Sequence, residues 1–233
     1  MTIVLILGSG PNAVTARDWP RSAFDHIVAI NNAHLIRPDW SHHIFPWDFP
    51  PERVPAPSPE QTQIQQTQFV PAQNDYGGFV YAGGTMAFTA AYWALSALRP
   101  KVLAFMGCDM QYPASGDTHF YGKGTADPLR EDITLRSLEA KSARMMILAA
   151  RQGCAAVNLS TQASRLVLPR AQINTLAQVP LATFDAARAD QAMLRETALN
   201  YVSPTGRYWE EAERFDPKEI DALDCLWLAA AQV

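Results

Sequence analysis

The sequence predicts an α/β fold, namely a Rossmann-like, doubly wound and mainly parallel sheet with a helical C-terminal extension. Short runs rich in Val, Ile and Leu are bounded by glycine, as expected of strands buried on both faces. These runs alternate with stretches of helical periodicity. Hydrophobic residues make up 48% of the 233 residues and charged residues 18%, which is ample for a sizeable core.

The first part of the chain contains three expected strands. The run TIVLIL, residues 2–7, stops at the glycine turn GSGP. A second run spans residues 26–34 and includes the pair Asn31 and Asn32. The third, SHHIFPWDF, covers residues 41–49, and Pro46 marks its end because proline cannot donate to a sheet ladder.

Residues 50–73 are rich in Pro and Gln and nearly uncharged, which predicts a surface excursion, either a flap over a site or a plain loop. The run over residues 83–98 is expected to form a helix that begins after Gly83 and Gly84, with Thr85 as its N-cap. Its composition is apolar nearly all round, so we expect it to be buried.

The second part of the chain continues the alternation. We expect a strand over residues 101–110, a helix over 129–153 and a strand over 154–160. Two further helices are expected around residues 182–202 and 217–231. The expected organisation is a Rossmann-like nucleotide-binding domain over residues 1–165 and a helical segment over 166–233 that packs on it to form one compact unit.

Composition and charge restrict the class of protein. The formal net charge of -4 excludes a broadly basic surface, so we expect no nucleic-acid partner. Three cysteines without C-x-x-C spacing argue against a zinc ribbon or a disulfide framework and suit a reducing cytoplasm. The start lacks a basic region, and no apolar run reaches the length of a membrane span, so neither a signal peptide nor a transmembrane segment is expected. The prediction is a cytoplasmic protein, with peripheral association at the inner membrane face left open.

Polar clusters follow several of the expected strands. Open α/β sheets bind ligands beyond the carboxyl ends of their strands, where the strand order switches. The expected binding residues for a nucleotide or its donor group are Gly8, Ser9, Gly10, Pro11, Asn31, Asn32, Gly83, Gly84, Thr85, Tyr112 and Tyr121.

Two glycine turns carry most of this expectation. In GSGPN the glycines expose backbone amides ahead of a helix start, which favours an anion, although a turn needed only for tight packing is the alternative. The dinucleotide fingerprint is incomplete, and Asn31 and Asn32 stand where a ribose-binding acid is expected, so an NAD enzyme is disfavoured. These asparagines suit a nucleobase edge or ribose hydroxyls, or simply a turn. The turn at Gly83 and Gly84 offers a second helix start for a phosphate, or a close strand–helix crossing.

The loop after the strand over residues 101–110 holds the candidate catalytic groups. His119 is expected to act as a general base, oriented by Asp109 or Asp117, with Tyr112 and Tyr121 bonding a leaving phosphate oxygen. A plain surface histidine is the alternative. No metal site or cofactor is expected, because His42 and His43 adjoin on a strand and face opposite ways and no D-x-D pair is present.

Several of these motifs resemble the MptE-like superfamily. They are the GSGP opening, the G-G-[ST] helix start and the pattern G-x-D-[LM]-x-Y followed by T-H, here Gly107, Asp109, Tyr112 and the pair Thr118 and His119. The superfamily includes flagellin-modifying motility accessory factors and archaeal-type 6-hydroxymethylpterin diphosphokinases. The chain is more distantly similar to small bacterial sialyltransferases that use a CMP-activated sugar. The resemblance covers roughly residues 3–160.

The resemblance implies a Rossmann-like fold that binds a nucleotide or nucleotide-sugar. It implies that residues 8–11 and Asn31 hold the nucleotide, that residues 83–85 face the donor, and that Tyr112 lies near its phosphate. His119 matches the T-H of the MptE-like group.

The leading hypothesis is a metal-independent glycosyltransferase with His119 as general base. Its donor would be a nucleotide-activated sugar such as a CMP-nonulosonate, and its acceptor a glycan or protein hydroxyl. ATP-dependent pyrophosphoryl transfer to a pterin-like alcohol and a non-catalytic nucleotide-binding module are the alternatives. The oligomeric state is left open, because the apolar stretch CLWLAAAQV docks either within the fold or against another subunit.

Overall fold

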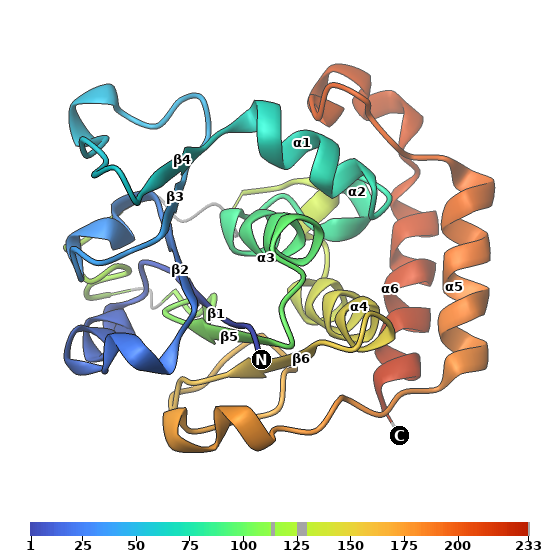
Figure 1. The fold of residues 1–233 in the computed structure, drawn as a ribbon. Coiled ribbons are helices and arrows are strands. Elements are labelled where there is room, and N and C mark those ends of the chain that lie inside the picture. The colour runs from blue at the N-terminus through green and yellow to red at the C-terminus, as the bar shows by residue number, and fades with distance from the viewer. Residues whose placement is uncertain (113–114, 125–129, 233) are drawn as a thin grey trace.

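The predicted α/β, Rossmann-like fold is confirmed by a computed structural model that describes residues 1–112, 115–124 and 130–232. Six strands form one sheet in the order β4-β3-β2-β1-β5-β6, and every neighbouring pair is parallel (Figure 1). The strands are β1 (Ile3–Leu7), β2 (His26–Ile30), β3 (His42–Ile44), β4 (Thr62–Ile64), β5 (Val102–Met106) and β6 (Ala155–Asn158). The strand order switches direction between β1 and β5, which are neighbours in the sheet.

Both faces of the sheet are covered. One face carries α1 (Gln66–Asn74), α2 (Phe79–Ala82), α3 (Met86–Ala97) and α4 (Leu138–Arg151). The other carries short 3-10 helices over Pro11–Asp18, Asn31–Leu35 and Ile173–Gln178. Successive strand residues alternate between the two cores, so Val4 and Ile6 face the α-helices while Leu5 and Leu7 face the 3-10 side.

The helix starts follow from capping residues. Thr85 caps α3, as predicted, with its Oγ1 accepting a hydrogen bond from Phe88 N at 3.3 Å. The helix expected over residues 129–153 begins later, because Ser137 caps α4 and its Oγ accepts from Ala140 N. A separate 3-10 turn, Ile133–Leu135, precedes it. Residue 129, the first of that expected helix, lies outside the described residues.

The expectation of a plain excursion over residues 50–73 is wrong in its second half. This segment contains β4, which pairs with β3 at the sheet edge, and α1, which begins with a reciprocal capping pair of Gln65 and Gln68. An edge strand of three residues with little apolar alternation leaves too weak a pattern to recognise. The single-turn helix α2 was not expected either.

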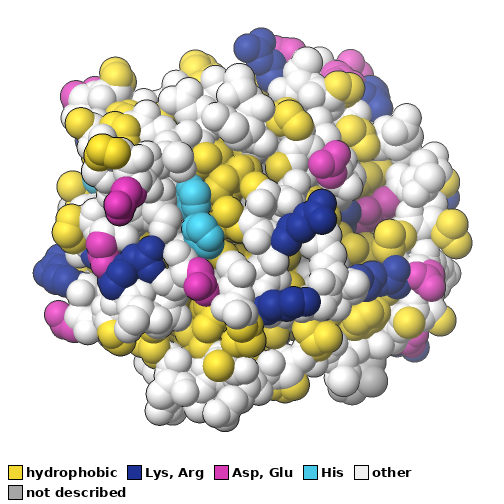
Figure 2. Space-filling view, viewed as in Figure 1, with side chains coloured by type: hydrophobic (Ala, Val, Ile, Leu, Met, Phe, Trp, Pro, Cys, Tyr) yellow, Lys and Arg dark blue, Asp and Glu magenta, His cyan; other side chains and the backbone are white. Residues whose placement is uncertain are grey.

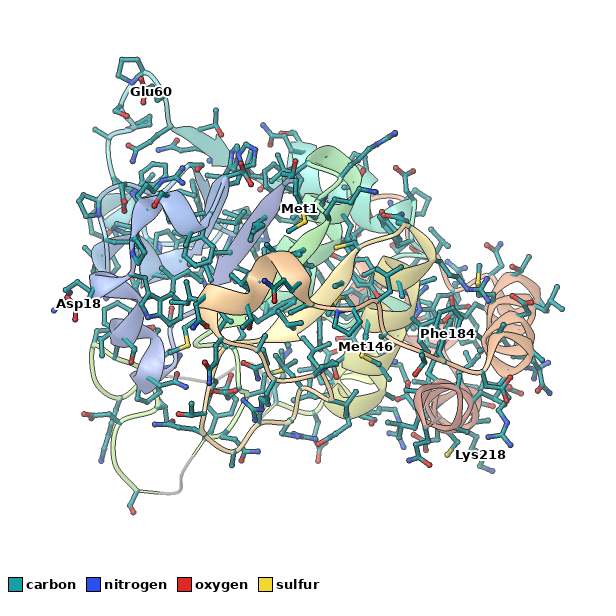
Figure 3. All side chains as sticks on the ribbon, turned by 60° about the horizontal axis from the view of Figure 1, so that its bottom comes forward. Met1, Asp18, Glu60, Met146, Phe184 and Lys218 are labelled. Carbon is teal, nitrogen blue, oxygen red and sulfur yellow. The ribbon has the colours of Figure 1, made fainter. Side chains whose placement is uncertain are left out.

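The C-terminal part adds α5 (Ala186–Leu199) and α6 (Pro217–Ala231) beside α4 (Figure 1). Figure 3 shows Phe184 and Lys218, near the starts of these helices, at the opposite end of the molecule from Glu60 near the β4 edge. Trp227, in the apolar stretch near the C-terminus, is buried in the same core as α4.

The surface drawn in Figure 2 intersperses Lys and Arg with Asp and Glu and forms no broad basic area on that face. Within the described part of the chain, no helix combines the length and apolar character needed to span a bilayer.

Candidate functional site

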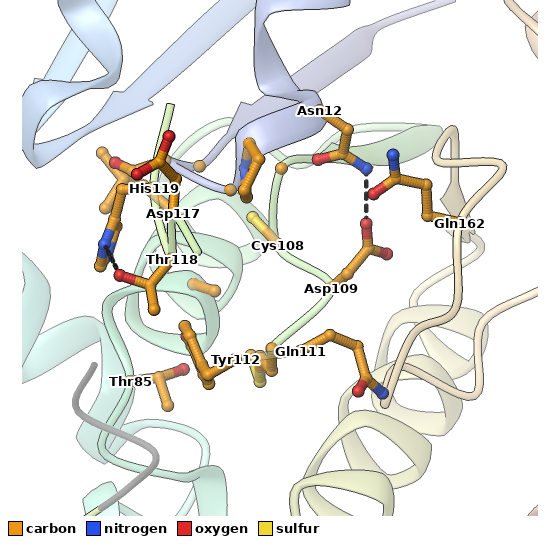
Figure 4. A pocket seen from close by; sticks show the side chains of 18 of the residues that line it. Asn12, Thr85, Cys108, Asp109, Gln111, Tyr112, Asp117, Thr118, His119 and Gln162 are labelled. Carbon is orange, nitrogen blue, oxygen red and sulfur yellow. Dashed lines mark hydrogen bonds between the residues drawn. The ribbon is translucent and has the colours of Figure 1, made fainter. Parts of the chain in front are cut away.

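A cavity of about 340 Å³ lies at the switch point of the sheet (Figure 4). It opens beyond the carboxyl ends of β1, β2 and β5 and against the start of α3, where ligands of open α/β sheets bind. We call it the switch-point pocket. Among the predicted site residues it brings together Gly8, Ser9, Gly10, Pro11, Asn31, Thr85, Asp109, Tyr112, Asp117, His119 and Tyr121.

The other three predicted residues lie elsewhere. Asn32 is buried and lines an adjoining cavity of about 1030 Å³. Gly83 packs against Phe88, whose ring would lie 2.7 Å from an added Cβ. Gly84 lines a separate cavity beyond Met86. At the second glycine turn, therefore, only Thr85 faces the switch-point pocket.

The first glycine turn is a close crossing of two backbones. Gly8 N donates to Met106 O and Gly10 N donates to Gly107 O, each at 2.8 Å. A Cβ on Gly8 would lie 2.4 Å from Gly107 O, so only glycine fits. The amides of Gly8 and Gly10 are thus engaged inside the fold rather than presented to an anion, and the packing interpretation of this turn is the one that the structure supports.

Asn31 holds an uncommon backbone conformation at the pocket wall. Its φ is +50°, in the left-handed region that few residues other than glycine adopt. Its carbonyl oxygen accepts hydrogen bonds from both His34 Nδ1 and His43 Nε2 at 2.8 Å, which holds this conformation. Burial lowers the pKa of His43 to about 4, so the ring is neutral near pH 7. Asparagine adopts the left-handed region more readily than most residues, so this conformation is compatible with a turn as well as with a binding role.

His119 is fixed against the first glycine turn. Phe120 N donates to Ser9 O at 3.0 Å, and His119 exchanges two backbone hydrogen bonds with Gly122. The His119 ring stacks on Tyr121 with 5.0 Å between centroids. The imidazole therefore lies in the wall of the same pocket as the glycine turn, as the sequence predicted.

One partner of the His119 ring is Thr118, which precedes it in sequence and which sequence analysis did not identify as an orienting group. Nδ1 of His119 lies 2.9 Å from Thr118 Oγ1 (Figure 4). The Thr118 hydroxyl also accepts a hydrogen bond from Gly124 N at 3.0 Å and lies 3.2 Å from Gly124 O, so Thr118 is itself held in place by the backbone of Gly124. The contact with Thr118 therefore fixes the orientation of the imidazole in the pocket wall.

Asp109 lies across the pocket from His119 (Figure 4). Its carboxylate accepts hydrogen bonds from Asn12 Nδ2 at 2.7 Å and from Asn158 Nδ2 at 3.0 Å, and only 8% of the residue is exposed. The expected pairing of Asp109 with His119 is therefore not what the structure shows. Asp109 instead ties together the carboxyl ends of β1, β5 and β6. Asp117 is exposed on the His119 side of the pocket.

The charges around the pocket are unevenly placed. Its described lining includes the carboxylates Asp109 and Asp117 but neither Lys nor Arg. The N-terminus of α3 supplies the positive end of a helix dipole. The adjoining cavity shares Asn31 and Tyr121 with the pocket and is also lined by Arg53 and Lys123. Glu52 also lines that cavity, so two of the three charged side chains in its described lining are positive and an anionic part of a ligand would lie toward Arg53 and Lys123.

Nucleophilic catalysis by Cys108 and metal binding receive little support from the described residues. Burial raises the pKa of the Cys108 thiol, which disfavours the nucleophilic thiolate. Among the described residues no three His, Cys, Asp or Glu side chains are grouped to hold a metal ion. His42 packs against His26 and Trp93, whereas His43 packs against Trp40, so the adjacent histidines face opposite sides of the sheet as predicted.

No family model, curated protein or solved structure matches this chain. Fold and site alone define the class, an α/β protein with a polar pocket at the switch point of a parallel sheet. Its wall carries an imidazole with one ring nitrogen held by Thr118.

Proposed function

We propose that this protein is a glycosyltransferase-like enzyme that takes its sugar from a nucleotide-activated donor, such as a CMP-sugar. The observation that supports this best is the position of His119 in the switch-point pocket, with Nδ1 held by Thr118. A general base at a nucleotide-type pocket is what transfer to a hydroxyl requires.

The donor would occupy the switch-point pocket together with the adjoining cavity. Their volumes, about 340 and 1030 Å³, span the range of small-molecule sites. Asn31 lies where the two meet and offers an amide to a base or a ribose. Arg53 and Lys123 supply positive charge for the phosphate.

The reaction would run as a displacement at the anomeric carbon. His119 Nε2 takes the proton of the acceptor hydroxyl while its oxygen forms a bond to that carbon. The bond from the carbon to the phosphate oxygen breaks, and the nucleotide leaves with the electron pair. Tyr112 and Tyr121, which line the pocket, would donate hydrogen bonds to the leaving oxygen.

Pyrophosphoryl transfer from ATP is the weaker proposal. It would normally require magnesium bound by carboxylates. The Asp109 carboxylate already accepts from two asparagines, which leaves Asp117 as the other carboxylate in the described lining of the pocket.

A thermal-shift series with CMP, UDP, ADP and ATP, each with EDTA and with magnesium, tests the proposal. We expect CMP to raise the Tm in EDTA, since a ligand at about 100 times its Kd stabilises the folded state by about 2.7 kcal/mol. Stabilisation by ATP with obligatory magnesium would favour pyrophosphoryl transfer instead. If no nucleotide raises the Tm, both proposals fail.

A matched pair of variants locates the binding. Asn31→Gly keeps the left-handed backbone and removes the amide, so it should reduce the shift with CMP. Asn200→Gly is the control, because Asn200 has a φ of +49° at the end of α5 and lines neither cavity. Equal shifts in the two variants would place the nucleotide elsewhere.

A further inference from the structure

A third cavity, of about 660 Å³, adjoins the switch-point pocket across Met86, which lines both. The start of α3 separates the two, with Gly84 facing this third cavity and Thr85 facing the switch-point pocket. Its walls come from the segment after β3, the helices α1 and α2, and the 3-10 helix Tyr208–Arg214. Segments far apart in sequence therefore meet beside the predicted reaction centre.

Two tryptophans line this cavity while remaining open to water. Trp47 is 70% exposed and Trp209 is 53% exposed. Below them Phe79 stacks on Tyr208 with 6.2 Å between ring centroids, and Trp209 meets Tyr208 edge-on at 5.3 Å. Trp209 is thus supported by an aromatic pair, and together with Trp47 it offers exposed indole surface to a ligand that has an apolar face.

A fixed polar network forms another wall. The Asp132 carboxylate accepts hydrogen bonds from Tyr208 OH at 2.7 Å, from Arg130 Nε at 3.0 Å and from Thr134 Oγ1 at 2.6 Å. Arg130 Nη2 also donates to Tyr208 OH at 3.1 Å. Although burial opposes ionisation, these hydrogen bonds hold the pKa of Asp132 below its usual range. The polar groups are therefore held in place before any ligand arrives.

We propose that this cavity, which we call the tryptophan cavity, binds the carbohydrate acceptor of the transfer reaction. A sugar ring has an apolar C–H face that stacks on an indole and hydroxyl edges that pair with groups such as Arg130 and Asp132. The cavity adjoins the switch-point pocket across one side chain, where the second substrate of a transferase must lie. This inference rests on the proposed function and names the acceptor class.

Saturation-transfer NMR without any nucleotide tests the inference separately from the donor proposal. The probes are methyl glycosides of glucose, galactose, mannose and N-acetylglucosamine, together with lactose and maltotriose, at millimolar concentration. We expect at least one probe to bind through its C–H face. Trp47→Ala and Trp209→Ala should each weaken that binding by about tenfold.

Leu194→Ala is the control, because Leu194 is exposed on α5 away from the tryptophan cavity, and its binding signal should equal that of the unaltered protein. Circular dichroism melts check that all three variants fold. The inference is overturned if no probe binds, if the tryptophan variants bind as the control does, or if adenosine or pterin binds through these tryptophans while sugars do not. Sugar binding without nucleotide stabilisation would refute the donor proposal and leave this one standing.

Discussion

At the scale of single residues, the wall of the switch-point pocket combines side chains whose positions are set by their neighbours. The His119 imidazole is held by Thr118 and Tyr121, while the backbone of Asn31 is held by His34 and His43. Orientation of this kind lowers the cost of reaching a reactive geometry.

Replacing His119 with alanine should lower the release of CMP from a CMP-sugar donor by about a hundredfold or more, the usual contribution of a general base. The Tm shift with CMP should change little. Thr118→Val removes the group at Nδ1 and should also slow turnover, whereas Thr118→Ser keeps the hydroxyl and should not. Unchanged turnover in His119→Ala would remove this residue from the mechanism.

The stability of the protein should fall in acid because of His43. Burial lowers its pKa from 6.5 to about 4, so between these values the unfolded chain binds more protons than the folded one. The free energy of unfolding should therefore decrease as the pH falls through this window, by about 3 kcal/mol at most. Urea denaturation at several pH values measures it. A His43→Gln variant should show a flatter pH dependence of the free energy of unfolding. An equally steep dependence would assign the effect to other groups such as His42. The pKa of His42 is also lowered to about 4, by burial and by the neighbouring His26.

At the scale of elements, the crossing of the first glycine turn with the end of β5 determines where the pocket lies. Gly107 has a φ of +71°, and an added Cβ would lie 2.5 Å from Ala13 Cβ. Gly8 approaches the same point from β1. The two strand ends can approach this closely only because neither residue carries a side chain.

Gly107→Ala should therefore destabilise the protein by about 2 to 5 kcal/mol, the sum of left-handed strain and overpacking. Gly153→Ala provides a matched comparison, since Gly153 has a φ of +72° and an added Cβ would meet only Lys101 Nζ at 3.6 Å. It should lose only about 1 to 2 kcal/mol from strain. Equal losses, measured by urea denaturation, would contradict the close-crossing explanation.

At the scale of the whole molecule, α5 and α6 are joined to α4 by buried ion pairs. Arg144 Nε and Nη2 donate to the two carboxylate oxygens of Glu196 at 2.7 Å, and Trp227 Nε1 donates to the same carboxylate at 2.8 Å. Lys141 Nζ lies 2.8 Å from Asp224 Oδ1. The C-terminal helices thus complete the core on the helical side of the sheet.

Removing the Glu196 carboxylate should leave the Arg144 guanidinium buried without its charge partner. We expect Glu196→Ala to lower the free energy of unfolding by about 3 to 5 kcal/mol. Asp221→Ala breaks a pair of the same two-bond geometry with Arg136 that lies on the surface, and should cost about 0 to 1 kcal/mol. A loss in Glu196→Ala no larger than in Asp221→Ala would show that the buried pair does not hold the helices together.

The sequence predicted most of the fold because central parallel strands leave a strong signal. The cores of β1, β2, β5 and β6 are continuous apolar runs, and α3 has a recognisable N-cap in Thr85. The edge strand β4 and the helix α1 escaped notice, since a short polar strand at an edge has no apolar pattern to reveal it.

The candidate site was predicted in its location more than in its contacts. His119, Asp109 and Asn31 were recognised because they follow strands that end at one edge of the sheet. The partners of Asp109, namely Asn12 and Asn158, are distant in sequence, and no local pattern joins them. For the same reason the tryptophan cavity was not foreseen, although Trp47 follows a predicted strand.

By itself the sequence determined which runs form the central strands and which residue caps α3, because burial and turn chemistry leave periodic and compositional marks along the chain. It did not determine where the strands end, since the expected runs over residues 26–34, 41–49 and 101–110 extend beyond β2, β3 and β5. Only the tertiary structure decided that Thr118 rather than Asp109 holds the His119 ring, and that Gly84 and Thr85 face different cavities. These relations depend on the directions in which side chains and backbone point, even between residues that are adjacent in sequence. Such directions are set by packing in three dimensions.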